Sequence, residues 1–175
     1  HQLHHFCNNA NAAIRLSIWK AHPYDESLTG LEDLAWAKRA FEQGSTIAYI
    51  AEAEIIHVHS DTPFGVLNRY RREAMAFKPI FPDEHFHLWE FTRLVITNVI
   101  SDLWHAARDQ TRQDNAGIDH RIRSIFWFRL MQFWGTYQGY RQTGPLTWQL
   151  RQTFYYPHGV RGMAQAARRD LEPIR

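Results

Sequence analysis

The chain of 175 residues has a single cysteine, Cys7, and no long apolar run. One cysteine excludes a disulfide within the chain and fits a reducing compartment. Uninterrupted apolar stretches are short, as at residues 125–128, whereas a helix that crosses a bilayer needs about 20 mainly apolar residues. We therefore expect a cytoplasmic protein, peripheral at most at the cytoplasmic membrane, with no transmembrane helix.

Several start signals and motifs are also missing. The chain opens HQLHHFCNNANAAI, without an initiator methionine or a signal peptide, so we expect a fragment whose upstream half is absent. It has no G-x-x-x-x-G-K-[ST], G-x-G-x-x-G, G-x-S-x-G or paired C-x-x-C motif. It also has no D-x-D. None of the common nucleotide-binding or hydrolase signatures is therefore present.

The net charge is small, and the charged residues are unevenly distributed along the chain. The net charge is +2, but residues 1–85 have eight basic and eleven acidic residues, which gives −3. Residues 86–175 have twelve arginines, no lysine and seven acidic residues, which gives +5. Apolar residues make up 45% of the chain and aromatic residues 14%, so disorder of the whole chain is excluded. The two halves are expected to do different work.

Periodicity predicts an α/β front and a helical back. Alternating or β-branched stretches predict strands, and apolar residues at three- and four-residue steps predict helices. The proline-containing segment 78–84 marks a boundary, so we expect one unit at 1–82 and a helical extension at 83–175. The expected strands are 11–16, 46–50 and 54–59, and the expected helical segments are 17–22, 31–43, 63–77, 86–112 and 118–141.

The pair Glu32-Asp33 opens the expected helix 31–43. Such a pair is common at a helix start, where each carboxylate contributes about 0.3–1 kcal/mol through the helix dipole. Thr29 and Glu32 have the spacing of a capping box, and Gly44 stands where a left-handed C-terminal cap belongs. On these residues alone, the pair is either an ordinary helix start or a catalytic base and its neighbour.

Three other groups of residues have side chains suited to binding. His57 and His59 form H-x-H on an expected strand, so both imidazoles point to one face and either share a metal ion or are simply packed. Asn9 and Asn11 either line a sugar site or cap turns. An arginine-rich helix either is a solvated face or contacts phosphates; it contains Arg69, Arg71 and Arg72. No stacking platform or groove-reading motif accompanies it, so nucleic acid is not an expected partner.

The order of these pieces resembles a known family. The run NNANAAIRLSIWKAHPYDESLTGLEDLAWAKRAFEQGSTIAYIAEAEIIHVHS has an alanine-rich strand, an aromatic residue before Asp-Glu, Gly-x-Glu-Asp opening a helix, and a later strand ending in histidine. Over residues 6–80 it resembles the second half of the catalytic domain of inverting family 2 glycosyltransferases with the GT-A fold. The rear helices are similar, less specifically, to the extension of bacterial members that build surface polysaccharides.

The resemblance implies an activity and a set of site residues. It implies transfer of a hexosyl or deoxyhexosyl group from a nucleotide-diphospho-sugar to a saccharide or lipid-linked acceptor, in surface polysaccharide or glycolipid synthesis. Asp33 would be the general base, with Glu32 beside it. His57, rather than His59, would lie near the metal or the leaving phosphates. Further substrate contacts are implied at Asn9, Asn11, Gly30, Leu31, Trp36, Arg69 and Arg72.

The family also uses a D-x-D motif that holds Mg²⁺ or Mn²⁺ against the diphosphate. Because this chain lacks that motif, most ligands of the divalent cation would lie in the missing upstream part. We expect the acceptor side of a partial GT-A sheet, followed by helices, and we expect the 175 residues alone to be inactive.

The aromatic and arginine-rich stretch 118–141 leaves two interpretations open. It has the composition of a helix that lies in a membrane surface, and also that of a helix packed against other helices. Two other function classes stay open as well. One is a metal-dependent hydrolase that uses His57 and His59, and the other is a non-catalytic module that binds a membrane or a protein partner.

Overall fold

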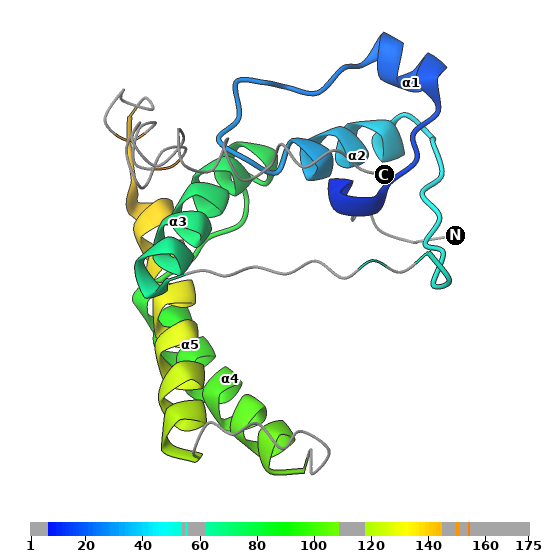
Figure 1. Cartoon of the computed structure of the whole chain (residues 1–175). Coiled ribbons are helices and arrows are strands. Elements are labelled where there is room, and N and C mark those ends of the chain that lie inside the picture. Colours follow the sequence, from blue (N-terminus) through cyan, green and yellow to red (C-terminus); the bar gives the residue numbers. More distant parts are fainter. Residues whose placement is uncertain are drawn as a thin grey trace, which may run out of the picture.

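The computed structural model describes residues 7–53, 55, 62–108, 118–144, 150 and 154. Within these ranges every regular element is a helix (Figure 1). The chain starts with a short 3-10 helix and two α-helices, which lie together at one end of the molecule, and continues with three longer helices. The elements are η1 (Asn9–Asn11), α1 (Leu16–Ala21), α2 (Glu32–Glu42), α3 (Pro63–Ile80), α4 (Leu88–Arg108) and α5 (Ile118–Arg141).

The expected partial GT-A sheet, and with it the α/β class, is wrong for the part of the chain that is described. Asn11 ends a 3-10 helix, and residues 45–50 are irregular, with Tyr49 75% exposed. Of the third expected strand only residue 55 is described. High β-propensity reports how well a side chain fits a pleated, half-buried surface, and a strand also needs a neighbour for its hydrogen bonds. No described segment provides that neighbour.

The helical predictions are confirmed with small shifts of their ends. α5 has the expected bounds, and α4 begins two residues later than expected. α2 ends in a complete Schellman motif: Gly44, at φ +82°, donates its N–H to the carbonyl of Phe41, and Ser45 donates to Ala40. Gly44 is therefore the predicted left-handed cap.

α3 runs three residues past its predicted end, through a proline. Thr62 caps its start by accepting a hydrogen bond from the N–H of Gly65 at 3.1 Å, and Pro63 occupies the first turn, where no N–H is needed. Pro79 lies in the last turn, so the missing N–H removes one hydrogen bond near the end without breaking the helix. The non-helical connection between α3 and α4 is instead residues 81–87.

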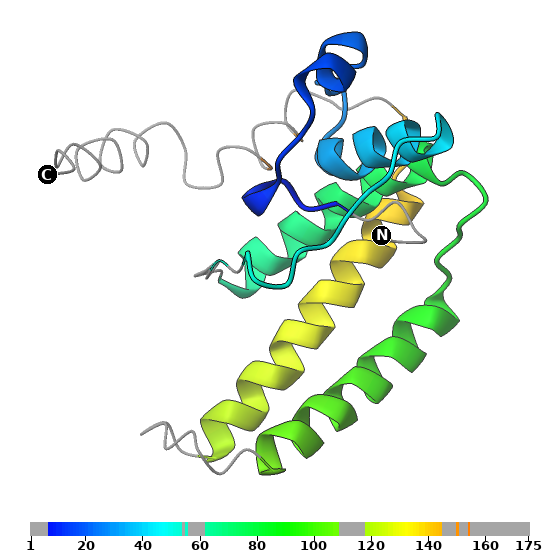
Figure 2. The ribbon, with the colours of Figure 1, turned by 90° about the vertical axis from the view of Figure 1, so that its right-hand side faces the viewer.

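α3 and α5 cross in backbone contact, side by side in both ribbon views (Figure 2). A Cβ atom added to Gly135 would lie 2.3 Å from the carbonyl oxygen of Leu67, and one added to Gly139 would lie 2.5 Å from the carbonyl oxygen of Arg71. Only glycine permits this approach. The spacing Gly-x-x-x-Gly puts both glycines on one face of α5, so the two helices meet over a full turn.

Polar side chains of α3 also fix the end of α5. Lys78 donates from Nζ to the carbonyl oxygens of Tyr140 and Gln142, both at 2.9 Å. Arg71 donates from Nη2 to Oε1 of Gln142 at 2.8 Å. A cation at a helix C-terminus satisfies carbonyls that have no intrahelical partner. α3 lies before the expected boundary at residue 82 and packs against a helix that lies after it.

α4 and α5 form an antiparallel pair, here called the α4–α5 hairpin (Leu88–Arg108 and Ile118–Arg141), which extends away from α1 and α2 (Figure 2). Asp102 of α4 accepts two hydrogen bonds from Arg129 of α5, at 2.6 and 2.9 Å. Nearer α3, the ring of Phe91 makes an edge contact with Trp134 at 5.5 Å between centroids. A bidentate ion pair and aromatic contacts therefore align the two helices.

Candidate functional site

The start of α2 has unusual backbone geometry. Its N-cap residue is Leu31, at φ 59° and ψ 29°, which is the left-handed region. Leu31 is the only residue other than glycine with positive φ in the described part of the chain. For a residue with a Cβ this conformation costs about 1–2 kcal/mol. Strain of this kind persists where surrounding structure holds it, and it is common at functional sites. The next two residues are Glu32 and Asp33.

The Asp33 carboxylate is held by two backbone N–H groups. Oδ2 accepts a hydrogen bond from the N–H of Asn9 at 2.8 Å, and Oδ1 accepts one from Leu34, in its own helix, at 2.8 Å. Asn9 is presented by η1, whose start is capped by Asn8 through a bond from the N–H of Ala10. The two helix starts, 24 residues apart in sequence, thus converge on one partly buried carboxylate.

Two further titratable side chains adjoin this carboxylate. Tyr24 donates its hydroxyl hydrogen bond to Oδ1 of Asn9 at 3.2 Å. Burial, with smaller contributions from Cys7 and Asp33, raises the pKa of the Tyr24 hydroxyl. Burial and the negative charge of Asp33 raise the pKa of the Cys7 thiol. Both groups therefore keep their protons at physiological pH. We call this cluster the Asp33 site (Cys7, Asn9, Tyr24 and Asp33).

The ring of Trp36 packs against the Tyr24 ring of the Asp33 site. Trp36, one turn further along α2, makes an edge contact with the ring of Tyr24, with centroids 6.2 Å apart and ring planes at 70°. Its indole N–H donates to the carbonyl oxygen of His22 at 2.6 Å, which fixes the ring plane. Both rings are partly exposed. Rings of this kind offer an apolar face to a ligand and a polar edge for orientation.

The loop before α2 is tied to α3. Thr29 donates its hydroxyl hydrogen bond to the carbonyl oxygen of Arg72 at 2.9 Å, and a Cβ added to Gly30 would lie 3.6 Å from Nε of Arg72. The predicted capping box is therefore wrong, because Thr29 bonds to α3 and the N-cap of α2 has no side-chain hydrogen bond. The structure thus brings Gly30, Leu31 and Arg72 together with the start of α2.

The other predicted site residues either make contacts outside the Asp33 site or lie outside the described residues. Asn11 donates from Nδ2 to the carbonyl oxygen of Ala53 at 2.6 Å, so it fixes a turn. Arg69 lies on α3 with its guanidinium 5.1 Å from the centroid of the Tyr70 ring. His57 and His59 lie outside the described residues. Within the described ranges, no three metal-ligating side chains gather in a way that would hold a metal ion.

A basic cleft lies between the end of α3, residues 82–87 and the end of α5. This open cleft of about 390 Å³ is lined by Lys78, Glu84, His85, His87 and Arg141, among others. Its histidine rings lie 6.0 Å apart, and Nδ1 of His85 is 2.8 Å from the carbonyl oxygen of Asp83. None of its lining residues belongs to the Asp33 site, so the cleft is separate from that site.

Sequence reasoning missed two members of the Asp33 site. From the sequence alone, Cys7 is a thiol without a disulfide partner, and Tyr24 is an aromatic residue before Asp-Glu. No spacing rule connects residues 7, 24 and 33, because the intervening chain is partly irregular and its path is set by tertiary contacts. The only local signal was that Cys7 directly precedes the asparagine-rich stretch 8–11; Tyr24 lies 13 residues beyond Asn11 and had none.

Comparison of the chain with known protein families, with curated proteins and with solved structures found no match.

Proposed function

We propose that this chain contributes the acceptor side of an inverting glycosyltransferase, with Asp33 as the general base. The reaction class is transfer of a hexosyl or deoxyhexosyl group from a nucleotide-diphospho-sugar to a hydroxyl of a saccharide or lipid-linked acceptor. The observation that carries the proposal is the Asp33 carboxylate itself, oriented by the N–H of Asn9 and preceded by the strained backbone of Leu31.

The hydrogen bonds of Asp33 suit a base. Each carboxylate oxygen has two lone pairs, and each accepts one backbone N–H, at 2.8 Å. Within the described residues, one acceptor position per oxygen is therefore available to a substrate hydroxyl. Because backbone N–H groups hold the carboxylate, its position does not depend on a flexible partner. Fixed orientation of a reacting group is a large part of what an enzyme contributes to rate.

The chemistry assigns one proton to Asp33. As the acceptor oxygen attacks the anomeric carbon, its proton passes to the Asp33 carboxylate, the new C–O bond forms, and the bond from the anomeric carbon to the diphosphate oxygen breaks. The nucleoside diphosphate leaves with both electrons on the opposite face of the sugar, so the configuration inverts. Trp36 and Tyr24 would border the acceptor sugar, and Glu32 would orient it.

In this proposal, further polypeptide supplies the donor side. The sequence contains no D-x-D to hold Mg²⁺ or Mn²⁺ against a diphosphate, and the described residues contain no ready metal cluster. Neutralising the leaving diphosphate is a main requirement of this reaction. The 175 residues alone are therefore expected to give no product, and Arg72, beside Gly30, would contact the phosphates of the donor.

The test is a transfer assay on a longer protein that includes upstream coding sequence, supplied with a panel of nucleotide-diphospho-sugars and hydroxyl acceptors. We expect acceptor-dependent release of nucleoside diphosphate, and a product with inverted anomeric configuration by NMR. Asp33→Asn should lower kcat by about 10²–10⁴-fold, the usual worth of a general base. An unchanged rate in Asp33→Asn would instead favour a non-catalytic module, and a retained configuration would rule out this mechanism.

A further inference from the structure

The outer half of the α4–α5 hairpin, residues 96–108 and 118–127, has large apolar side chains that no other described part of the chain covers. On α4, Ile96, Ile100 and Trp104 follow each other at four-residue steps and are 53–61% exposed. On α5, Ile118 and Ile122 continue the same spacing and are 79% and 45% exposed. Residues four apart lie on one face of a helix, so each helix presents a stripe of large apolar side chains to solvent.

α3 does not reach this part of the hairpin. It crosses α5 at Gly135 and Gly139, and the ring of Tyr70 makes an edge contact with the ring of Phe128. Beyond that point the hairpin continues away from the remaining helices (Figure 2). Isolated surface leucines or isoleucines are ordinary, but contiguous apolar patches mark an interaction surface.

The charge of the hairpin indicates what would cover the surface. Its two helices contain six arginines and three acidic residues, and one of these acids, Asp102, is already paired with Arg129. The guanidinium of Arg108 lies 4.1 Å from the centroid of the Trp104 ring, at the outer end of α4. Tryptophan with arginine at the edge of an apolar stripe is the pattern of a helix in a membrane surface, where the apolar face enters the acyl boundary and the cation meets anionic headgroups.

The other occupants fit less well. None of the helices in the described part of the chain is both long enough and apolar enough to span a bilayer. A second copy of the chain would bring two arginine-rich hairpins together, and like charges oppose such contact. An anionic lipid surface instead matches the exposed isoleucines and tryptophans and also the excess of arginine.

We propose that the outer half of the α4–α5 hairpin lies in the surface of an anionic lipid bilayer and holds the rest of the chain beside it. The hairpin enters only the headgroup and upper acyl region, with the stripes of Ile96, Ile100 and Trp104 on α4 and of Ile118 and Ile122 on α5 inserted. Bilayer binding needs no sugar donor or acceptor, so its outcome is independent of the proposed transfer reaction.

The experiment is co-sedimentation of the full chain with vesicles of phosphatidylcholine, with and without about one third phosphatidylglycerol. We expect binding to the anionic vesicles in low salt, weakened by high salt, and a blue shift of tryptophan emission. Ile100→Glu should lower the partition coefficient on the order of tenfold or more, since it removes inserted apolar area and adds a repelled charge. Arg108→Gln with Arg123→Gln should lower it by about tenfold on anionic vesicles only.

The matched control is Ile50→Glu, because Ile50 is 62% exposed and Ile100 is 61% exposed, and Ile50 lies outside the hairpin. The control should bind vesicles like the unmodified chain, and circular dichroism should show that both variants keep their helices. The proposal is overturned if no binding occurs in low salt, or if Ile50→Glu weakens binding as much as Ile100→Glu. It is also overturned if Ile100→Glu only abolishes self-association in analytical ultracentrifugation, which would assign the surface to a second copy.

Discussion

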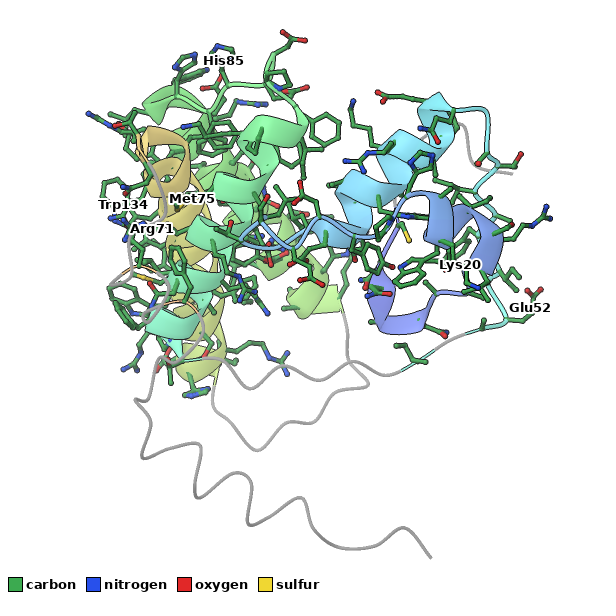
Figure 3. The ribbon with its side chains drawn as sticks, turned by 90° about the horizontal axis from the view of Figure 1, so that it is seen from above. Lys20, Glu52, Arg71, Met75, His85 and Trp134 are labelled. Carbon is green, nitrogen blue, oxygen red and sulfur yellow. The ribbon has the colours of Figure 1, made fainter. Side chains whose placement is uncertain are left out.

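The segment from residue 7 to residue 55 and the unit of α3, α4 and α5 are held together in different ways. In the helical unit, whole faces meet: backbone contacts backbone at Gly135 and Gly139, and an ion pair joins the two helices of the hairpin. In the front segment, single hydrogen bonds connect distant residues, such as the one from Asn9 to Asp33, and the buried side chains of α2 are alanines. Figure 3 shows the two parts on opposite sides, with Arg71 and Trp134 in one and Lys20 and Glu52 in the other.

We therefore expect most of the folding stability to come from the unit of α3, α4 and α5, and the proposed activity to depend on the front segment. Distributed backbone contacts and ion pairs make a scaffold that a single surface change leaves intact, whereas a site built from single bonds is sensitive to each of them. The charge follows the same division: residues 1–61 have four basic and eight acidic residues, which gives −4, and residues 62–175 have sixteen basic and ten acidic residues, which gives +6. A substitution in one part of the molecule whose effect appears in the other part would contradict this division.

The largest expected effect is on the crossing of α3 and α5. Gly135→Ala puts a methyl group where 2.3 Å separates it from the carbonyl oxygen of Leu67, so the helices must move apart. We expect the free energy of unfolding to fall by roughly 2–3 kcal/mol, the usual cost of overpacking, despite the better helix propensity of alanine. Chemical denaturation followed by circular dichroism measures it.

Ser124→Ala is the control for this change, since Ser124 is exposed on the same helix and has no role in the crossing. Its free energy of unfolding should change by less than about 0.5 kcal/mol. Equal stability of the two variants would mean that the glycines do not set the distance between α3 and α5.

A smaller effect of opposite sign is expected at Leu31. Leu31→Gly removes the Cβ from a residue at φ 59°, which relieves about 1–2 kcal/mol of strain but adds backbone entropy to the unfolded chain. We expect the free energy of unfolding to rise by up to about 1 kcal/mol. In the longer protein, kcat should fall, because the carboxylates that follow lose their fixed position. A rise in both stability and kcat would contradict a functional role for the strain.

The smallest expected effect is on Cys7, the only thiol of the chain and therefore a specific reporter. Burial and Asp33 raise its pKa above the ordinary 9.0, so alkylation at a pH of about 8 should be slower than for an exposed thiol. Asp33→Asn removes the charge and should lower the thiol pKa, so that alkylation speeds up a few-fold. Asp25→Asn is the control and should leave the rate unchanged, because Asp25 is not among the causes of the shift.

The same shift gives the stability a pH dependence with a definite sign. The folded state keeps the proton on Cys7 more tightly than the unfolded state does. This contribution is therefore fully present below pH 9.0 and is lost as the pH rises through the higher pKa of the folded protein. Tyr24, whose pKa is also raised, acts in the same direction above its ordinary 10.0. Stability measured across this range should therefore fall.

The helices could be predicted from the sequence because their signals are local. Gly44 after α2, the Thr62-Pro63 start of α3 and the apolar spacing of α5 each lie within a few residues of the structure that they specify. The strands could not be predicted in this way. Residues 46–50 have strand-like composition, but pairing depends on a neighbour that lies elsewhere in the chain or outside it.

The candidate site was predictable only in part. Glu32 and Asp33 are predicted from their place at a helix start and from the resemblance, and their catalytic roles stay a prediction. The structure places Leu31 directly before them and Arg72 beside Gly30. The left-handed conformation of Leu31 has no sequence signal, because leucine rarely adopts it. The close crossing of α3 and α5 does have a sequence signal, the spacing Gly-x-x-x-Gly in α5, which favours close approach of two helices.

The most direct test of the account compares two adjacent carboxylates in the longer protein, under saturating donor and acceptor. Asp33→Asn and Glu32→Gln each remove one negative charge from the same turn of α2 with almost no change of shape. We predict that kcat falls by 10²-fold or more in Asp33→Asn and by about tenfold at most in Glu32→Gln. Equal losses, or a larger loss in Glu32→Gln, would contradict the assignment of residue 33 as the base.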